Sequence, residues 1–116
     1  MIASNVYLAW LLVVLAGVLS TLGNLCLKKS SNEAEGVFAI LMHPFFLSGM
    51  FFYGINVVLF AKALQSLAVS KAYPVLAAVG FTSLSIAAFF IFKENLSPAN
   101  YIGIMVILVG IFLLST

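Results

Sequence analysis

Four long apolar runs limit what this chain can fold into. Of its 116 residues, 65% are hydrophobic and 7% are charged, which is too little charge to cover a soluble domain of this size. Runs of about 20 apolar residues match the hydrocarbon core of a bilayer, which is about 30 Å thick. We therefore predict an all-α integral membrane protein with short connections, in which a single domain at 1–116 contains helices at residues 6–27, 44–64, 69–92 and 98–114.

The composition also excludes several classes of function. A net charge of +2, without a basic cluster, gives no footprint for a nucleic acid. Because Cys26 is the single cysteine and His43 the single histidine, we expect no metal site, no cofactor and no internal disulfide. No nucleophile with a partner base stands out, so we do not expect an enzyme. Residues 1–5 carry no lysine or arginine and precede a run too long for a signal peptide, so we interpret that run as a membrane helix.

The first apolar run contains two polar residues on one face. Ser20 and Asn24 are four residues apart and therefore share a helix face. Gly17 and Gly23 flank them and would let another backbone approach. Ser20 and Asn24 either line a polar cavity that binds a substrate or hold helices together, through hydrogen bonds of about 0.6 kcal/mol each.

The connection after the first run is the one stretch with a soluble character. We expect Lys28 and Lys29 to stop the first helix, and residues 30–36 to form a short polar loop. Residues 37–42 are apolar but few. They either lie at the membrane interface before Pro44 or form the first turns of the second helix.

The second run also carries polar residues at helical spacing. Gly49, Tyr53 and Asn56 fall on one face, and Asn56 lies near the middle of the membrane. A buried amide there needs a hydrogen bond to a neighbour or to water, so Tyr53 and Asn56 are candidate substrate contacts. Lys62 lies at the far end, where it can reach the headgroups. The connection to the third run is short, which predicts that the second and third helices are antiparallel neighbours.

The third run begins with a lysine, a tyrosine and a proline. A charge in the bilayer costs about 3 to more than 10 kcal/mol at the centre and less near the interface, and a proline inside a helix removes a backbone donor. Lys71 and Tyr73, with a helix kink at Pro74, therefore indicate a polar cavity that binds substrate. Alternatively, Lys71 reaches the headgroups and Pro74 lies in the first helical turn. A polar stripe along this helix comprises Lys71, Ala78, Thr82 and Ser85, of which Thr82 is another candidate substrate contact.

The fourth run suits contact with another chain. It has no polar side chain between Tyr101 and Ser115, so it lines no polar path. Gly103 and Gly110 are seven residues apart and share a face, which favours close helix packing. Four short helices do not readily enclose a solvated path. We therefore predict a dimer of eight helices, formed with itself or with a similar four-helix chain, with Gly103 and Gly110 at the interface.

The sequence specifies orientation weakly. The loops after the first and third helices carry Lys28, Lys29 and Lys93, whereas the other side carries Lys62 and Lys71. Under the positive-inside rule this small bias places the first set in the cytoplasm. Insertion in both orientations, as an antiparallel dimer needs, is the alternative.

Two motifs resemble the four-helix members of the drug/metabolite transporter superfamily. One is Val69-Ser70-Lys71-Ala72-Tyr73-Pro74-Val75-Leu76 leading to Gly80-Phe81, and the other is Lys93-Glu94-Asn95-Leu96-Ser97-Pro98 leading to Gly103 and Gly110. The first helix, with Ser20-Thr21-Leu22-Gly23-Asn24-Leu25-Cys26-Leu27-Lys28, is similar to both four-helix branches. These are the small multidrug resistance exporters and the subunits that flip aminoarabinose-phosphoundecaprenol. The resemblance covers nearly the whole chain and implies a multi-pass protein of the bacterial inner membrane.

One position separates the two branches. The multidrug exporters carry a glutamate eight residues before the lysine that ends the first helix, and it binds the cation and the coupling proton in alternation. Ser20 stands at that position here, and it cannot titrate or neutralise a cation. The resemblance therefore favours the flippase subunits, whose Ala-Tyr-Pro matches Ala72-Tyr73-Pro74, and it implies no proton-coupled cation export. Lys71 is not carried over from either branch.

Three functions follow as hypotheses. The first is translocation of a lipid-linked sugar or polyprenyl phosphate, with membrane lipid as the partner. Lys71 would neutralise the phosphate, and Ser20, Asn24, Asn56 and Tyr73 would bind sugar hydroxyls. The second is export of small polar or cationic compounds without an internal carboxylate. The third is a non-transporting membrane subunit of a glycolipid-modifying complex.

Overall fold

The computed structural model describes residues 2–115, and the side chains of residues 6–114. This part of the chain is helical apart from its short connections, as predicted for an all-α membrane protein. The elements are α1 (Ile2–Glu33), α2 (Val37–Leu41), α3 (Pro44–Ala63), α4 (Val69–Ile91) and α5 (Pro98–Ser115).

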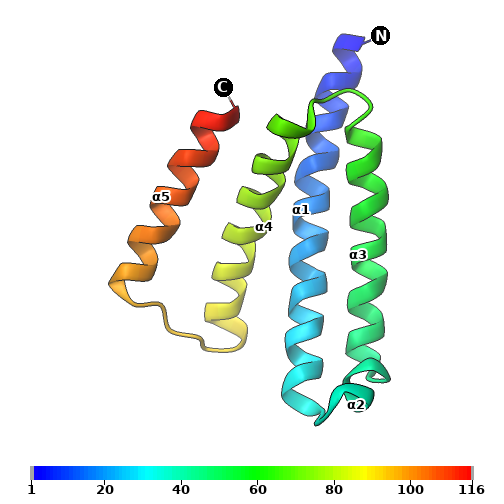
Figure 1. Ribbon diagram of the computed structural model, residues 1–116, viewed down its shortest axis with the longest axis vertical. Coiled ribbons are helices and arrows are strands. Elements are labelled where there is room, and N and C mark those ends of the chain that lie inside the picture. The colour runs from blue at the N-terminus through cyan, green and yellow to red at the C-terminus, as the bar shows by residue number, and fades with distance from the viewer. Residues whose placement is uncertain (1, 116) are drawn as a thin grey trace.

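The four long helices stand side by side in a row (Figure 1). Helix α1 packs against both α3 and α4, and α5 packs against α4. The row measures 49 × 34 × 19 Å, so it is thin in one direction. Helices α3 and α4 run in opposite directions, as predicted, but the expectation that they are direct neighbours is wrong along most of their length. Helix α1 lies between them, because the small residues that permit close packing lie on two sides of α1.

Small residues bring α1 close to both neighbours. A methyl group added at Gly49 of α3 would lie 3.0 Å from the carbonyl oxygen of Gly23, and one at Gly17 would lie 2.7 Å from Cγ1 of Val79 on α4. The hydroxyl of Thr21 lies 3.1 Å from the carbonyl oxygen of Gly80, so it can bond α1 to α4. Helices in lipid associate through this kind of van der Waals contact and hydrogen bond, because lipid tails are as apolar as the side chains.

A small apolar cluster lies at the end of the bundle where α3 ends and α4 begins. Ala9 and Val13 of α1 are buried against Ala63 of α3 and Ala72 of α4. Nearby, the rings of Phe60 and Tyr73 meet edge to face, with centroids 6.2 Å apart. The turn between α3 and α4 therefore packs onto the first half of α1.

Helix α1 continues past the two lysines that were expected to stop it. It ends at Glu33, so Lys28 and Lys29 lie within the helix, as do the first residues of the predicted loop. Lysine is a good helix former, so it does not end a helix. Its charge only limits how much of the helix can lie in lipid. Ser30 is fully buried in this last part, and its hydroxyl donates to the carbonyl oxygen of Leu27 at 2.7 Å.

Helix α2 is separate from α3. Its Val37 and Phe38 side chains are exposed, as is Met42 after it. The extended backbone of His43 interrupts the helix between α2 and α3, so residues 37–42 are not the first turns of the second long helix. Their exposed apolar side chains suit the membrane interface, which was the other expectation.

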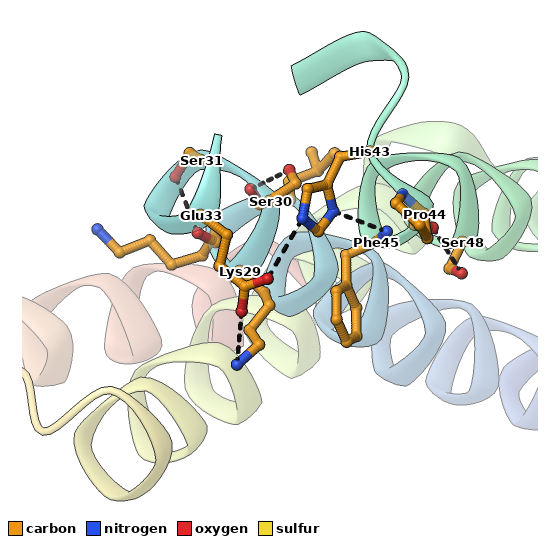
Figure 2. Close-up of polar contacts among 10 residues, drawn as sticks. Lys29, Ser30, Ser31, Glu33, His43, Pro44, Phe45 and Ser48 are labelled. Carbon is orange, nitrogen blue, oxygen red and sulfur yellow. Dashed lines mark hydrogen bonds and ion pairs between the residues drawn. The ribbon is translucent and has the colours of Figure 1, made fainter. Parts of the chain in front are cut away.

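Polar contacts around Glu33 connect the end of α1 to the start of α3 (Figure 2). The carboxylate of Glu33 lies 2.9 Å from Nζ of Lys29 and 3.3 Å from Nε2 of His43. Nδ1 of His43 accepts a hydrogen bond from the backbone of Phe45, which caps α3, and Pro44 fills the first helical position. The Lys29 ammonium also lies 5.8 Å from the centre of the Phe45 ring.

Three of the helices are long and apolar enough to cross a membrane. The spans are residues 6–33, 44–63 and 69–91. Helix α5 is as apolar but shorter, with 18 residues and a length of about 27 Å. The fourth membrane span therefore stays a prediction.

Leucine at Gly17 should separate α1 from α4. Its side chain has no room beside the branched Val79, and overpacking of this kind costs about 1–3 kcal/mol. We expect Gly17→Leu to lower the midpoint of thermal unfolding in detergent, followed by circular dichroism. Gly54→Leu is the matched control, because an added Cβ at Gly54 meets nothing within 4 Å. Equal midpoints for the two variants would show that the α1/α4 contact is not tight.

Candidate functional site

A groove between α1 and α4 collects three of the predicted site residues. Ser20 and Asn24 of α1 line one wall, and Tyr73 of α4 lies on the other. The hollow has a volume of about 230 Å³. Its other lining residues are Leu76, Ala77, Gly80, Phe81 and Leu84.

The groove has polar groups available in its middle. The side-chain amide of Asn24 donates to the carbonyl oxygen of Ser20 at 3.0 Å. Within the described residues, neither Oδ1 of Asn24 nor the hydroxyl of Ser20 has a hydrogen-bond partner. These two groups can therefore bind hydroxyl groups of a ligand without first breaking a bond in the protein.

A second hollow continues the groove toward the end of α4. It also has a volume of about 230 Å³ and shares Asn24 and Leu84 with the first. Its remaining lining residues are Leu25, Lys28, Ala88, Phe92 and Glu94. We call the two hollows together the α1/α4 groove. Their shared residues place them end to end, with uncharged polar groups in the first and a charged pair in the second.

The charged pair lies where the groove ends. Nζ of Lys28 is 3.7 Å from Oε2 of Glu94, and both side chains are 47% exposed. Exposed ion pairs contribute about 0–1 kcal/mol to stability, so this contact is readily exchanged.

The predicted residues of α3 lie on the other side of α1. Tyr53 packs against Gly23, where an added Cβ would come within 3.1 Å of the tyrosine ring. The Oδ1 atom of Asn56 is buried and accepts no hydrogen bond from any described residue. An unpaired buried amide oxygen is unusual, so Asn56 has an open binding capacity.

The site residues predicted on the third helix do not face one place. Thr82 and Ser85 line a largely apolar hollow of about 290 Å³ between α4 and α5, which also includes Tyr101. Tyr73, by contrast, faces α1. The predicted set is therefore distributed around α4 rather than gathered along one path.

Lys71 lies at the start of α4 and outside the α1/α4 groove. Its side chain is exposed, and it is the third residue of the helix. Pro74 is inside the helix rather than in its first turn, and α4 continues through it. The Pro74 ring removes the backbone donor that would reach the carbonyl oxygen of Ser70. The kink at Pro74 and the role of Lys71 stay predictions.

Two groove residues were not predicted from the sequence. Lys28 was interpreted as the end of a helix, and Glu94 as part of a turn. One signal was available, because Ser20, Asn24 and Lys28 recur every four residues and so continue a single stripe. Glu94 carried no such signal, since its position depends on how the turn after α4 folds back.

These features define a class of protein. A thin row of apolar helices with a groove open on its side is suited to moving a solute across a membrane. Neither hollow of the groove contains an acidic residue except Glu94 at its end. The fold and site are those of a small membrane transporter.

The family follows from comparison with known proteins. The model of the Small Multidrug Resistance protein family matches residues 8–107, so this chain belongs to that family. It is a small transporter of the bacterial inner membrane, as the resemblance in the sequence implied.

Curated relatives are similar over most of their length. An uncharacterized protein of Sinorhizobium fredii, y4nH, is 45% identical over 108 residues, covering 90% of this chain and 92% of the relative. A probable 4-amino-4-deoxy-L-arabinose-phosphoundecaprenol flippase subunit, ArnE, of Klebsiella pneumoniae is 32% identical over 109 residues, covering 92% and 96%. The protein of the same name from Salmonella newport is 34% identical over 107 residues, covering 90% and 95%.

Proposed function

We propose that this transporter moves a lipid-linked sugar or polyprenyl phosphate across the inner membrane. One observation carries the proposal. The groove presents the uncharged Ser20 and Asn24 where export of a cation by proton exchange would need a carboxylate. Hydroxyl and amide groups suit sugar hydroxyls, and the open side of the groove leaves room for a lipid tail. The ArnE relatives, named as probable flippase subunits, support the same substrate class.

Several side chains would share the binding of the headgroup. Ser20, Asn24 and Tyr73 line the groove and would hydrogen-bond the sugar. Asn56 of α3, with its unpaired oxygen, would also bind the headgroup if α1 and α3 move apart or a second chain adds to the site. Lys71 would attract the phosphate at the end of α4 that is opposite the Lys28–Glu94 pair.

We also propose that the working unit is a dimer joined through α5. A row 19 Å thick cannot surround a sugar by itself. Within the described residues, helix α5 packs chiefly against α4, and an added Cβ at Gly103 or Gly110 meets nothing within 4 Å. These glycines leave a shallow face on which the same helix of a second chain can pack closely.

A transport assay separates this function from export of a cation, which the family match supports as the second candidate. Vesicles containing the protein should move a fluorescent farnesyl phosphate between leaflets faster than protein-free vesicles. The Asn24 amide can donate to a passing phosphate as well as to a sugar, so Asn24→Leu should slow this about tenfold, as loss of a charge-assisted hydrogen bond does. Asn32→Leu, at the exposed end of α1, is the matched control.

A second experiment tests the alternative, export of a cation. Adding tetraphenylphosphonium to the protein in detergent should release no protons, because Ser20 cannot titrate. Proton release, together with no movement of farnesyl phosphate, would establish the cation exporter instead.

Lys71 should matter for transport more than Lys62 does. Lys71→Met keeps the apolar stem and removes the charge, so it should slow farnesyl phosphate movement without reducing expression. Lys71→Arg keeps the charge in a different shape and should be partly active. Lys62 donates to Oε1 of Gln65 at 2.8 Å at the end of α3, and Lys62→Met should have little effect. Equally small effects of both methionine variants would reduce Lys71 to a headgroup anchor.

Gly110 should control association of two chains. A leucine at this position would hold the facing helices apart, so Gly110→Leu should lower the dimer fraction measured by crosslinking in detergent. Gly54→Leu, on an open part of α3, serves as the comparison. An unchanged dimer fraction for Gly110→Leu would contradict an α5 interface.

A further inference from the structure

We infer that Lys28 is the anion-binding residue of the α1/α4 groove, and that it takes a phosphate group in exchange for the carboxylate of Glu94. The inference rests on the proposed function, because it names where the phosphate of that substrate class is held. It assigns a role to a residue that the sequence presents as the end of a membrane span.

The position of Lys28 in the groove is the first argument. Ser20, Asn24 and Lys28 form one stripe along α1, and Asn24 lines both hollows. A phosphate on the Lys28 ammonium therefore has the Asn24 carboxamide one helical turn away. The sugar attached to it would extend toward Ser20.

The weakness of the Lys28–Glu94 contact is the second argument. Its N–O distance of 3.7 Å is longer than a charge-assisted hydrogen bond, which is about 2.7–2.9 Å. The neighbouring Lys29 makes such a bond, 2.9 Å long, to Glu33. Of the two lysines at this end of α1, Lys28 is thus the one whose donors remain available to a ligand.

A phosphate is a stronger partner than a single carboxylate. A polyprenyl phosphate is a monoester, which carries about −1.5 to −2 charges at pH 7 and offers three acceptor oxygens. It would satisfy the three donors of the Lys28 ammonium better than Glu94 does at its present distance. Glu94 then acts as a counter-ion that occupies the site when no substrate is bound.

The turn after α4 places Glu94 at this position. Lys93 has a left-handed backbone, with φ of 55°, which is unfavourable for residues other than glycine. The backbone nitrogen of Glu94 then donates to the carbonyl oxygen of Ala88 at 3.3 Å, which folds the turn back over the end of α4. A strained residue directly before the counter-ion is consistent with a turn that shifts when the ligand arrives.

The walls of the second hollow accommodate the rest of a lipid phosphate. Leu25, Leu84, Ala88 and Phe92 are apolar and line the hollow beside the pair. A prenyl chain can leave along them into the membrane, while the phosphate stays at the exposed end.

The test measures binding of farnesyl phosphate to the purified full chain in detergent by isothermal titration calorimetry. Lys28→Met should weaken binding about 10- to 100-fold, the effect of losing a charged hydrogen bond. Lys29→Met is the matched control, because it removes the adjacent charge, which is paired with Glu33. It should leave the affinity within about twofold. Glu94→Gln should raise the affinity about threefold by removing the competing charge.

Further arms identify the source of the phosphate and separate the two proposals. Inorganic phosphate that binds as tightly as farnesyl phosphate would mean a free-anion site, and farnesol that binds as tightly would overturn any anion site. If the unaltered protein binds farnesyl phosphate and Lys28→Met binds it equally well, the role of Lys28 is wrong and the proposed function stands. If the unaltered protein does not bind it, both are overturned. Retained thermal unfolding of Lys28→Met and of Lys29→Met confirms that the variants fold.

Discussion

The close approach of α1 to both of its neighbours is the interaction on which the rest of the structure depends. Lipid gives no hydrophobic reward for bringing apolar helices together, so contact of small residues must hold them. Gly23 against Gly49 fixes α3 on one side of α1, and Gly17 with Thr21 fixes α4 on the other. Because α1 is held on two sides, the stripe that begins at Ser20 faces a defined place beside α4.

Much of this fold follows from the sequence, and the reason is hydropathy. Apolar runs long enough to span a membrane have to be helical, because every backbone group in lipid needs an internal partner. Hydropathy did not predict the order of the helices in the row. Connection length suggested that α3 and α4 pack together, but the two glycine contacts of α1 decided the order. Spacing of small residues in one helix does not say which other helix meets them.

The site was predictable in part for a similar reason. Polar residues at helical spacing identified Ser20 and Asn24 on one face, and the structure places Tyr73 opposite them. Lys28 was overlooked because a lysine after an apolar run is usually just its end. The helix continues to Glu33, so Lys28 keeps the register of the stripe and faces the groove. Thr82, on the same helix as Tyr73, turned toward α5 because a stripe drawn on one helix cannot show which neighbour it meets.

The distribution of charge along α4 suits the proposed passage of a phosphate through the groove. Lys71 and the Lys28–Glu94 pair lie at opposite ends of a 23-residue helix, about 35 Å long. Between them the groove offers only the neutral Ser20, Asn24 and Tyr73. A fixed cation midway would hold the phosphate in a deep minimum, whereas hydrogen bonds from neutral groups are weaker. Passage requires binding strong enough for entry and weak enough for release. Cations at the ends with neutral groups between them meet both conditions for the proposed phosphate.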